Sequence, residues 1–284
     1  MIGLVTDSNA QLPAELAERY GVEVVPLTVT VGGQDFLEGV DLDADGFYAL
    51  FESGRPAVST SQPSPGRFAA AYEALADRGA TEILSVHIGS SVSGTVNSAR
   101  LATRVAPVPV RIVDTGTASF AVSLCLWEAA EAVAGGAGIE DAAAAAERVS
   151  ATVGNVFVVG LLGVARAGGR LSSDVGTAGA SGAVTIPVLS LAGGVMQEVG
   201  RVGDVDRAAE AMAGFVASAA TGSSLRVGVG LSDRATQPLV DALEDRLRAD
   251  PGVRELVRYR IGPSVGAHTG PGTVGVMFAA APSA

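Results

Sequence analysis

Short apolar runs alternate with segments of helical length along the first half of this chain. Residues 2–6, 82–87 and 110–113 are apolar runs of strand length, and each ends in a polar loop. Residues 94–105 and 118–134 follow the second and third runs and have the length and composition of helices. Strands that alternate with helices of about 10–15 residues form βαβ units, so this pattern predicts a parallel sheet covered by helices.

The rest of the first half fits the same plan. Residues 59–65 are rich in Ser, Thr and Pro, which is the composition of a loop. We expect one or two strands within residues 22–31 and helices at residues 13–20, 43–51, 66–77 and 139–150.

The second half of the chain follows a different pattern. We expect helices at residues 205–220 and 235–249, and strands at residues 155–162, 187–191, 195–198, 225–231, 256–261 and 274–280. Gly193-Gly194 predicts a hairpin turn between two of these strands. Hairpins mixed with helices indicate an α+β domain. The predicted fold class is therefore α/β with two domains, a Rossmann-like parallel sheet in residues 1–152 and an α+β domain in residues 153–284.

Charge and hydropathy limit the partners of the protein. Its 284 residues include 19 basic and 30 acidic side chains, a net charge of −11. That charge argues against nucleic acid or an anionic membrane as a main partner, although it allows transient membrane contact. The longest apolar stretch, residues 118–139, is interrupted by Glu128 and Glu131 and does not predict a membrane span. The N-terminus lacks a basic region followed by an apolar core, so we expect a cytoplasmic protein.

The composition also removes several classes of chemistry. Every basic side chain is Arg, and without Lys there is no Schiff base and no P-loop lysine. Cys125 is the only cysteine, which excludes an internal disulfide and a CxxC metal site. The only histidines, His87 and His268, are distant from Cys125 in the sequence. We therefore expect no metal centre and no cofactor, although a carboxylate site for Mg²⁺ or Ca²⁺ stays open.

Hydroxyl side chains gather where the predicted strands end. In an open parallel sheet the loops after the strands share the carboxyl edge, where ligands bind. The hydroxyl and carboxyl residues of these loops are Thr6, Asp7 and Ser8, then Thr60, Ser61 and Ser64, then Ser90, Ser91, Ser93 and Thr95, and finally Asp114 and Thr115. We therefore expect a polar site built mainly from hydroxyls at this edge.

The loop at residues 89–95 gives the sharpest indication of a site. It passes from a strand into a helix, so unpaired backbone N–H groups and the positive end of the helix dipole face it. Its three serines and two flanking glycines predict a cradle for a carboxylate or a phosphate. The alternative is that Ser93 only caps the helix, which accounts for one serine but not for three.

Thr60, Ser61 and two aspartates give weaker indications. Thr60 and Ser61 lie close before a proline, and taken alone they are typical turn residues. Asp7 and Asp114 could ligate a metal, but no third carboxylate is nearby in the sequence, so helix capping is the favoured interpretation.

The two histidines and two arginines differ in their surroundings. His268 stands between glycines in a predicted loop at residues 262–272, where a functional role is favoured over a place in the core. His87, inside an apolar strand, is expected to be a hydrogen-bonded core residue. Arg166 and Arg170 either grip an anion or form a solvated helix terminus. Two further residues are expected in the core, Cys125 and Trp127.

An acyl hydrolase is the main enzymatic alternative. Ser91 and His268 could form a nucleophile–base pair, with Asp7 or Asp114 as the third member. The segment around Ser91 does not match G-x-S-x-G, and no G-x-G-x-x-G follows the first strand. Neither a nucleophile elbow nor a dinucleotide site is therefore indicated.

Eight of these segments together resemble the DegV family of bacterial fatty-acid-binding proteins. They occur in the family's order, span nearly the whole chain, and are Val5-Thr-Asp-Ser8, Val25-Pro-Leu27, Gly39-Val-Asp41, Thr60-Ser-Gln-Pro-Ser64, Ser90-Ser-Val-Ser-Gly-Thr95, Asp114-Thr115, Gly168-Gly-Arg170 and His268-Thr-Gly-Pro-Gly272. Each segment is weak evidence alone, whereas those that begin at Thr60, Ser90 and His268 are specific as a set.

The resemblance implies that one long-chain fatty acid is held between the two domains. By this likeness the carboxylate is held by hydroxyls of the two Ser/Thr loops, here Thr60, Ser61 and Ser91. The family's histidine, here His268, closes the polar cluster from the other domain. The same likeness extends the ligand-binding set to Ser90, Gly94, Thr95, Thr269 and Arg170.

The resemblance also implies a partner. In bacteria with a fatty-acid kinase, family members present the acid to a separate subunit that supplies ATP and Mg²⁺, and the acyl phosphate is used for phospholipid synthesis. The chain would then be a carrier and not an enzyme, with Arg170 and Arg201 meeting the kinase or the transferred phosphate. A lipid-sensing regulatory module is a further alternative. Departures from the family pattern are Ala165 before Arg166, Val92 in place of Leu, and a Gly/Ala-rich segment at residues 163–183.

Overall fold

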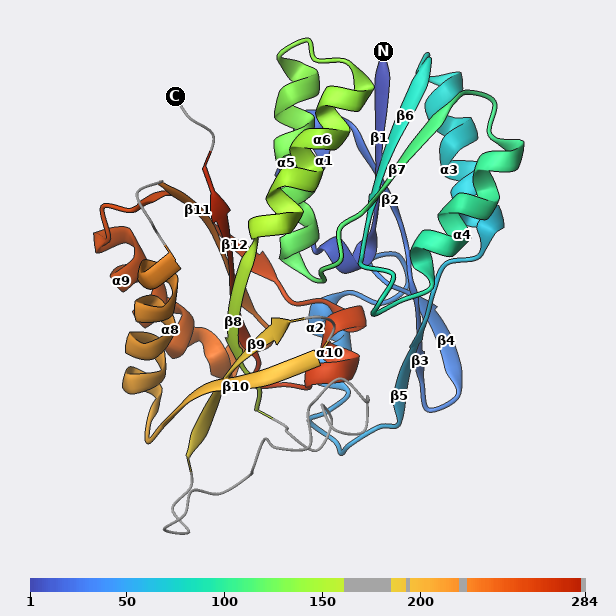
Figure 1. Cartoon of the computed structure of the whole chain (residues 1–284). Helices are drawn as coiled ribbons and strands as arrows, with labels where there is room; N and C mark the ends of the chain where they lie inside the picture. Colours follow the sequence, from blue (N-terminus) through green and yellow to red (C-terminus); the bar gives the residue numbers. More distant parts are fainter. Residues whose placement is uncertain (161–184, 193–194, 220–223, 282–284) are drawn as a thin grey trace.

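The computed structural model describes residues 1–160, 185–192, 195–219 and 224–281, which form three β-sheets with helices packed around them (Figure 1). A four-stranded parallel sheet lies in the N-terminal part and a six-stranded mixed sheet in the C-terminal part. This confirms the predicted α/β class. The chain passes from one sheet to the other after α6 (Ile139–Thr152), and the domain boundary at residue 152 stays a prediction.

The parallel sheet has the strand order β2-β1-β6-β7 and is buried on both faces. Its strands are β1 (Ile2–Asp7), β2 (Val22–Val25), β6 (Glu82–His87) and β7 (Val110–Asp114). Leu4 and Leu84 pack in the core formed with α5 (Phe120–Ala134) and α6. Val5 and Ile83, one residue along, pack with α3 (Pro65–Asp77) and α4 (Thr95–Ala102). Because both faces are covered, the two central strands β1 and β6 have mainly apolar, buried sequences.

A three-stranded antiparallel sheet with the order β4-β3-β5 extends from the parallel one (Figure 1). Its strands are β3 (Thr28–Val31), β4 (Gln34–Leu37) and β5 (Val58–Ser61), and α2 (Ala44–Ala49) lies between β4 and β5 in sequence. The prediction of a loop beginning at residue 59 is wrong, because Thr60 pairs with Val29 and Ser61 with Thr28. A partner strand 30 residues away, which local composition does not reveal, makes this segment a strand.

The mixed sheet has the order β10-β9-β8-β13-β11-β12, and only its β11–β12 pair is parallel. The strands are β8 (Gly154–Val158), β9 (Ile186–Ala192), β10 (Val195–Val202), β11 (Leu225–Leu231), β12 (Val253–Arg260) and β13 (Val274–Ala280). Two helices, α8 (Val205–Ala219) and α9 (Gln237–Ala249), form an apolar core with one face. The predicted turn at Gly193-Gly194 lies outside the described residues, as does the whole segment at residues 163–183.

The other face of the mixed sheet meets α5. Arg226 on β11 is buried there, with its Nε 2.6 Å from a Glu255 carboxylate oxygen and its Nη2 3.1 Å from Glu131. Its guanidinium lies 3.9 Å from the ring centroid of Trp127. Cys125 and Trp127 are both buried, which confirms their predicted place in the core. The ion pairs and the cation–π contact join the two large sheets through α5.

A short helix, α10 (Pro263–Thr269), stands where the sequence predicted a loop at residues 262–272. The loop prediction is wrong because groups distant in sequence stabilise the helix. The buried Glu38 carboxylate accepts a hydrogen bond from the Ser264 backbone N–H at 2.8 Å and another from the Ser8 hydroxyl at 2.5 Å. The first turn of α10 is therefore capped by residues of the N-terminal half of the chain.

No helix among the described residues is both long enough and apolar enough to cross a bilayer.

The parallel sheet is flanked on the α5 side by α1 (Ala14–Tyr20), which ends at Gly21 with a φ of 62°. The short 3₁₀ turns of the described chain lie at Ser8–Ala10, Thr103–Val105 and Arg234–Thr236.

Glu38 makes the stability of the fold depend on pH. Burial raises its pKa above the ordinary value of 4.5, and hydrogen bonds from Ser8, Ser264 and Gln11 offset part of that rise. Between the ordinary and the raised pKa the folded chain holds a proton that the unfolded chain has lost. The stability contributed by Glu38 therefore falls as the pH rises through this window.

We expect Glu38→Gln, whose side chain does not titrate, to gain stability relative to the wild type as the pH rises above about 4.5. Urea unfolding at several pH values between about 4 and 8 measures this difference. Glu73→Gln, at an exposed position on α3, is the control for losing one carboxylate. A Glu38→Gln difference that does not change with pH would contradict the assignment.

Candidate functional site

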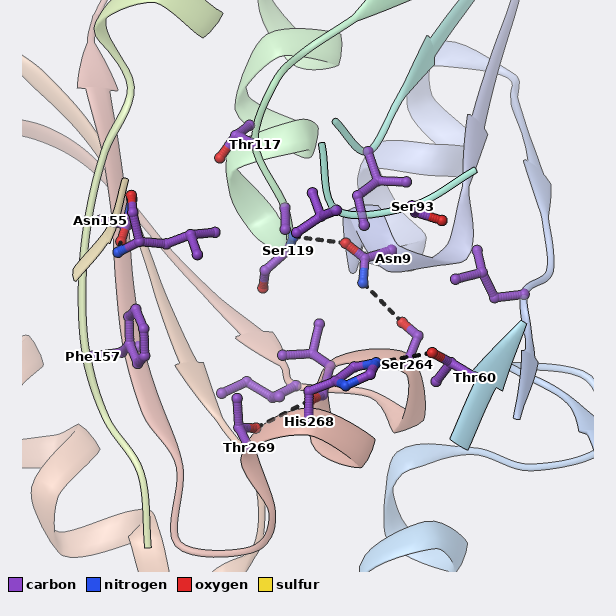
Figure 2. Close-up of a pocket in the computed structure, with 18 of the residues that line it drawn as sticks. Asn9, Thr60, Ser93, Thr117, Ser119, Asn155, Phe157, Ser264, His268 and Thr269 are labelled. Carbon is purple, nitrogen blue, oxygen red and sulfur yellow. Dashed lines mark hydrogen bonds between the residues drawn. The ribbon is translucent and has the colours of Figure 1, made fainter. Parts of the chain in front are cut away.

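A cavity of about 540 Å³ lies between the two large sheets and is closed at one end by α10 (Figure 2). Its wall is formed by the segments after β6 and before α5, by β5, and by strands of the mixed sheet. The large apolar side chains of the wall include Leu27, Ile88, Phe157, Leu191, Met196 and Met277. A concave, largely apolar space of this size is typical of small-molecule sites.

Thr60 and His268 meet at the polar end of this cavity. The Thr60 Oγ1 and His268 Nε2 atoms are 2.9 Å apart, as the dashed line in Figure 2 shows. Strand pairing fixes Thr60 on β5, and the capped α10 carries His268 in its last turn. Their neighbours Ser61 and Thr269 also line the cavity. His268 therefore lies on a helix and not in the predicted loop. It faces Thr60, one of the hydroxyl residues that the resemblance implied.

Ser93 is the serine of residues 89–95 that lines the cavity. Its Oγ is 2.8 Å from the Thr95 hydroxyl and accepts a hydrogen bond at 3.3 Å from the backbone N–H of Thr95, the first residue of α4, whose N-cap is Gly94. The loop can take this path because a Cβ on Gly89 would lie 2.6 Å from the Gly116 carbonyl carbon. Ser93 therefore lines the cavity and also bonds the first N–H group of α4, but it is not the N-cap that the alternative required.

Gly94 completes this part of the wall. Its missing side chain leaves room for the amide of Gln62, since a Cβ on Gly94 would lie 1.8 Å from Gln62 Oε1. The Gln62 amide donates a hydrogen bond to the Ser98 hydroxyl at 3.0 Å. The segment after β5 is thereby tied to the first turns of α4, and Gln62 and Gly94 both line the cavity.

Ser90 and Ser91 have exposed side chains and lie outside the cavity wall. Asp114 accepts hydrogen bonds from the Ser90 and Gly116 backbone N–H groups at 3.0 and 3.2 Å. Burial alone would raise the pKa of Asp114, but these hydrogen bonds outweigh it and lower the pKa. The prediction that Asp114 caps a helix is wrong, because both N–H groups belong to loops, which this carboxylate joins after β6 and β7. The ligand roles of Ser90, Ser91 and Thr95 stay predictions, and the wall contains none of the three.

His87 is a core residue, as predicted. It is buried, with Nδ1 2.9 Å from Asp7 Oδ2 and Nε2 2.6 Å from Ser85 Oγ. Asp7 also accepts hydrogen bonds from the backbone N–H groups of Asn9 and Ile88, each at 3.1 Å. It therefore caps the turn after β1 and joins that turn to the end of β6, which confirms its predicted capping role.

The arginines predicted to meet the kinase or the phosphate lie outside the cavity wall or outside the described residues. Arg170, like Arg166, lies outside the described residues. Arg201, on β10, forms an ion pair with Glu198 and donates a hydrogen bond to Thr185 at 3.0 Å. Arg201 does not line the cavity. Its contact with a kinase or a phosphate stays a prediction, and such a contact would be made outside the cavity.

Three residues that the sequence did not single out join the polar end to α5. Asn9 accepts a hydrogen bond from the Ser119 backbone N–H at 2.9 Å and donates one to the Ser264 hydroxyl at 3.2 Å (Figure 2). All three line the cavity. Asn9 belongs to the polar turn after the first strand, which was the available indication. Ser119 lies at the start of the helix predicted at residues 118–134, and Ser264 lies in the loop predicted at residues 262–272.

The described wall offers hydroxyl, amide and imidazole groups but no Arg, Lys, Asp or Glu side chain. It can therefore bind the polar head of an apolar molecule through hydrogen bonds but not through an ion pair with Arg or Lys. Among the described residues, no three His, Cys, Asp or Glu side chains come together as metal ligands would. The hydrolase pairing of Ser91 with His268 gains no support, because Ser91 is exposed and His268 bonds Thr60.

The chain is similar in sequence and in fold to known proteins of one family. A DegV domain-containing protein of Streptomyces coelicolor is 37% identical over 279 residues, 97% of each chain. Among solved structures, a DegV family protein from Thermus thermophilus, described for its fatty acid binding, is 32% identical with a TM-score of 0.87 and 99% coverage of each chain. A DegV fatty acid binding protein from Bacillus subtilis is 26% identical with a TM-score of 0.86 and the same coverage. The DegV family model matches residues 1–281, and the chain belongs to the DegV family.

Proposed function

We propose that this protein binds one long-chain fatty acid in the cavity, with its carboxylate at the Thr60–His268 end. The observation that carries the proposal is a largely apolar cavity with a hydroxyl–imidazole pair at one end. A 16-carbon acid has about 14 methylenes, and burying each one contributes about 0.8 kcal/mol, or roughly 11 kcal/mol before the costs of binding. The similar proteins from Thermus thermophilus and Bacillus subtilis, described as fatty acid binding, support the same ligand.

The carboxylate is held by hydrogen bonds in this account. Thr60 Oγ1 donates to one oxygen, and His268 Nε2 supports the head group from α10. Ser93, which lines the cavity, takes the place at the head group that the resemblance gave to Ser91. Burying a carboxylate without such donors would cost several kcal/mol, so the polar end fixes the orientation of the acid.

The protein acts as a carrier in this proposal, and the chemical step belongs to a separate kinase that supplies ATP and Mg²⁺. Ser61 and Gln62 are exposed although both line the cavity, so the carboxylate end lies near the protein surface. A carboxylate held there is accessible to another protein for phosphorylation. Arg170 and Arg201 keep their predicted role at that contact, and the cytoplasm stays the predicted location.

Fatty acid should be found in the purified protein. Extraction with organic solvent followed by mass spectrometry should recover about one long-chain acid per chain, or the protein should take up palmitate or oleate when it is supplied. Acyl esters should not be hydrolysed. Finding no acid and no uptake would contradict the proposal.

The same loaded protein tests the carrier role. With a fatty-acid kinase catalytic subunit, ATP and Mg²⁺, the bound acid should become an acyl phosphate. Lipid binding without phosphorylation by any such kinase would favour the sensor alternative.

Loss of a head-group donor should weaken binding. Thr60→Val keeps the shape of the side chain but removes the hydroxyl, and Ser93→Ala removes the second one. A hydrogen bond to a charged group contributes about 1.5–3 kcal/mol, so each change should raise the Kd for palmitate about 10- to 100-fold. Ser91→Ala, in the same loop but exposed, is the matched comparison and should change the Kd less than about twofold. A larger loss from Ser91→Ala than from Ser93→Ala would overturn this assignment of the head group.

A further inference from the structure

Two hydroxyl groups in the cavity wall are buried without a hydrogen-bond partner among the described residues. They are Ser119 Oγ and Tyr259 Oη, on residues that are 4% and 3% exposed. Both residues line the cavity. In Figure 2 the Ser119 hydroxyl points into the cavity, away from Asn9. An apolar site for an alkyl chain does not need these groups, and their position requires an explanation.

The Ser119 hydroxyl is held in place by its backbone. The Ser119 N–H donates to Asn9, and its carbonyl accepts from the Val122 N–H at 2.9 Å, which starts α5. Its φ of 61° is in the left-handed region, where a serine is uncommon. The side chain makes no capping bond with α5. The serine therefore does not use its hydroxyl for the helix, and the hydroxyl stays directed at the ligand space.

The Tyr259 ring is equally fixed. It stacks on Phe120 at 4.6 Å between ring centroids, with 12° between the planes. Its hydroxyl lies over two glycines, since a Cβ would be 2.6 Å from Oη at Gly230 and 3.5 Å at Gly275. Burial raises the pKa of Tyr259. The Ser119 hydroxyl interacts with the phenol and offsets part of that rise, although no hydrogen bond of acceptable geometry joins the two groups.

We infer that the cavity binds a long-chain fatty acid that carries an oxygen substituent, a hydroxyl or a keto group, on its chain. This inference rests on the proposed function and names the class of acid. A plain alkyl chain would cover Ser119 and Tyr259 and leave the two hydroxyls with no partner beyond each other. An oxygen on the chain at this level would bond both of them, and the difference is roughly 10- to 100-fold in affinity for one such group.

The test compares positional isomers with the unsubstituted acid. Isothermal titration of the lipid-free protein with stearate and with a series of hydroxystearates should show at least one isomer that binds about tenfold or more tightly than stearate. If every isomer binds as stearate does or more weakly, the inference is overturned while the proposed function stands. If stearate and all isomers fail to bind, the proposed function fails instead.

Two variants assign the preference to these hydroxyls. Ser119→Ala and Tyr259→Phe should each lower the affinity for the preferred isomer about tenfold and leave stearate bound at least as tightly, which inverts or abolishes the preference. Ser123→Ala is the matched control, because its buried hydroxyl donates to the Ala10 carbonyl at 2.7 Å and does not line the cavity. A preference that survives in both variants would overturn the inference, and circular dichroism checks that each variant is folded.

Discussion

An aromatic ring at the start of α5 packs directly against a glycine of the mixed sheet. Phe120, at the start of α5, lies so near β11 that a Cβ on Gly228 would be 2.2 Å from its ring. Tyr259 from β12 stacks on the same ring. Glycine inside a strand costs stability, and here it permits an approach that no other residue would allow. This contact fixes the start of α5 at the mixed sheet, and the cavity lies beside it, with Ala118 and Ser119 in its wall.

The opposite end of the cavity depends on α10. That helix is seven residues long and contains Pro and Gly, so its own sequence contributes little to its stability. Glu38 and Asn9, both from the N-terminal half, bond to Ser264 in its first turn, and His268 in its last turn bonds to Thr60. The head-group end of the site therefore exists only where the two halves of the chain meet. A ligand that bonds both Thr60 and His268 would strengthen the same contact.

The sequence predicts the elements that their own residues stabilise, and it misses those that depend on residues distant in the chain. β1 and β6 are predicted well because each is a largely apolar run buried on both faces, and β7 because a recognisable helix follows it. β5 was missed because a distant strand pairs with it, and α10 because distant side chains cap it. The candidate site divides in the same way. Three serines stand in one loop, and only the turn geometry of that loop decides that Ser93 faces the cavity while Ser90 and Ser91 face solvent.

The position of the bound carboxylate tests the account most directly. A crystal structure of the protein with palmitate should show the carboxylate oxygens within hydrogen-bond distance of Thr60 Oγ1 and His268 Nε2, with the alkyl chain passing Ser119 toward Phe157. A chain in the reverse orientation, with its carboxylate at the Asn155–Phe157 end, or an acid bound outside the cavity, would contradict it.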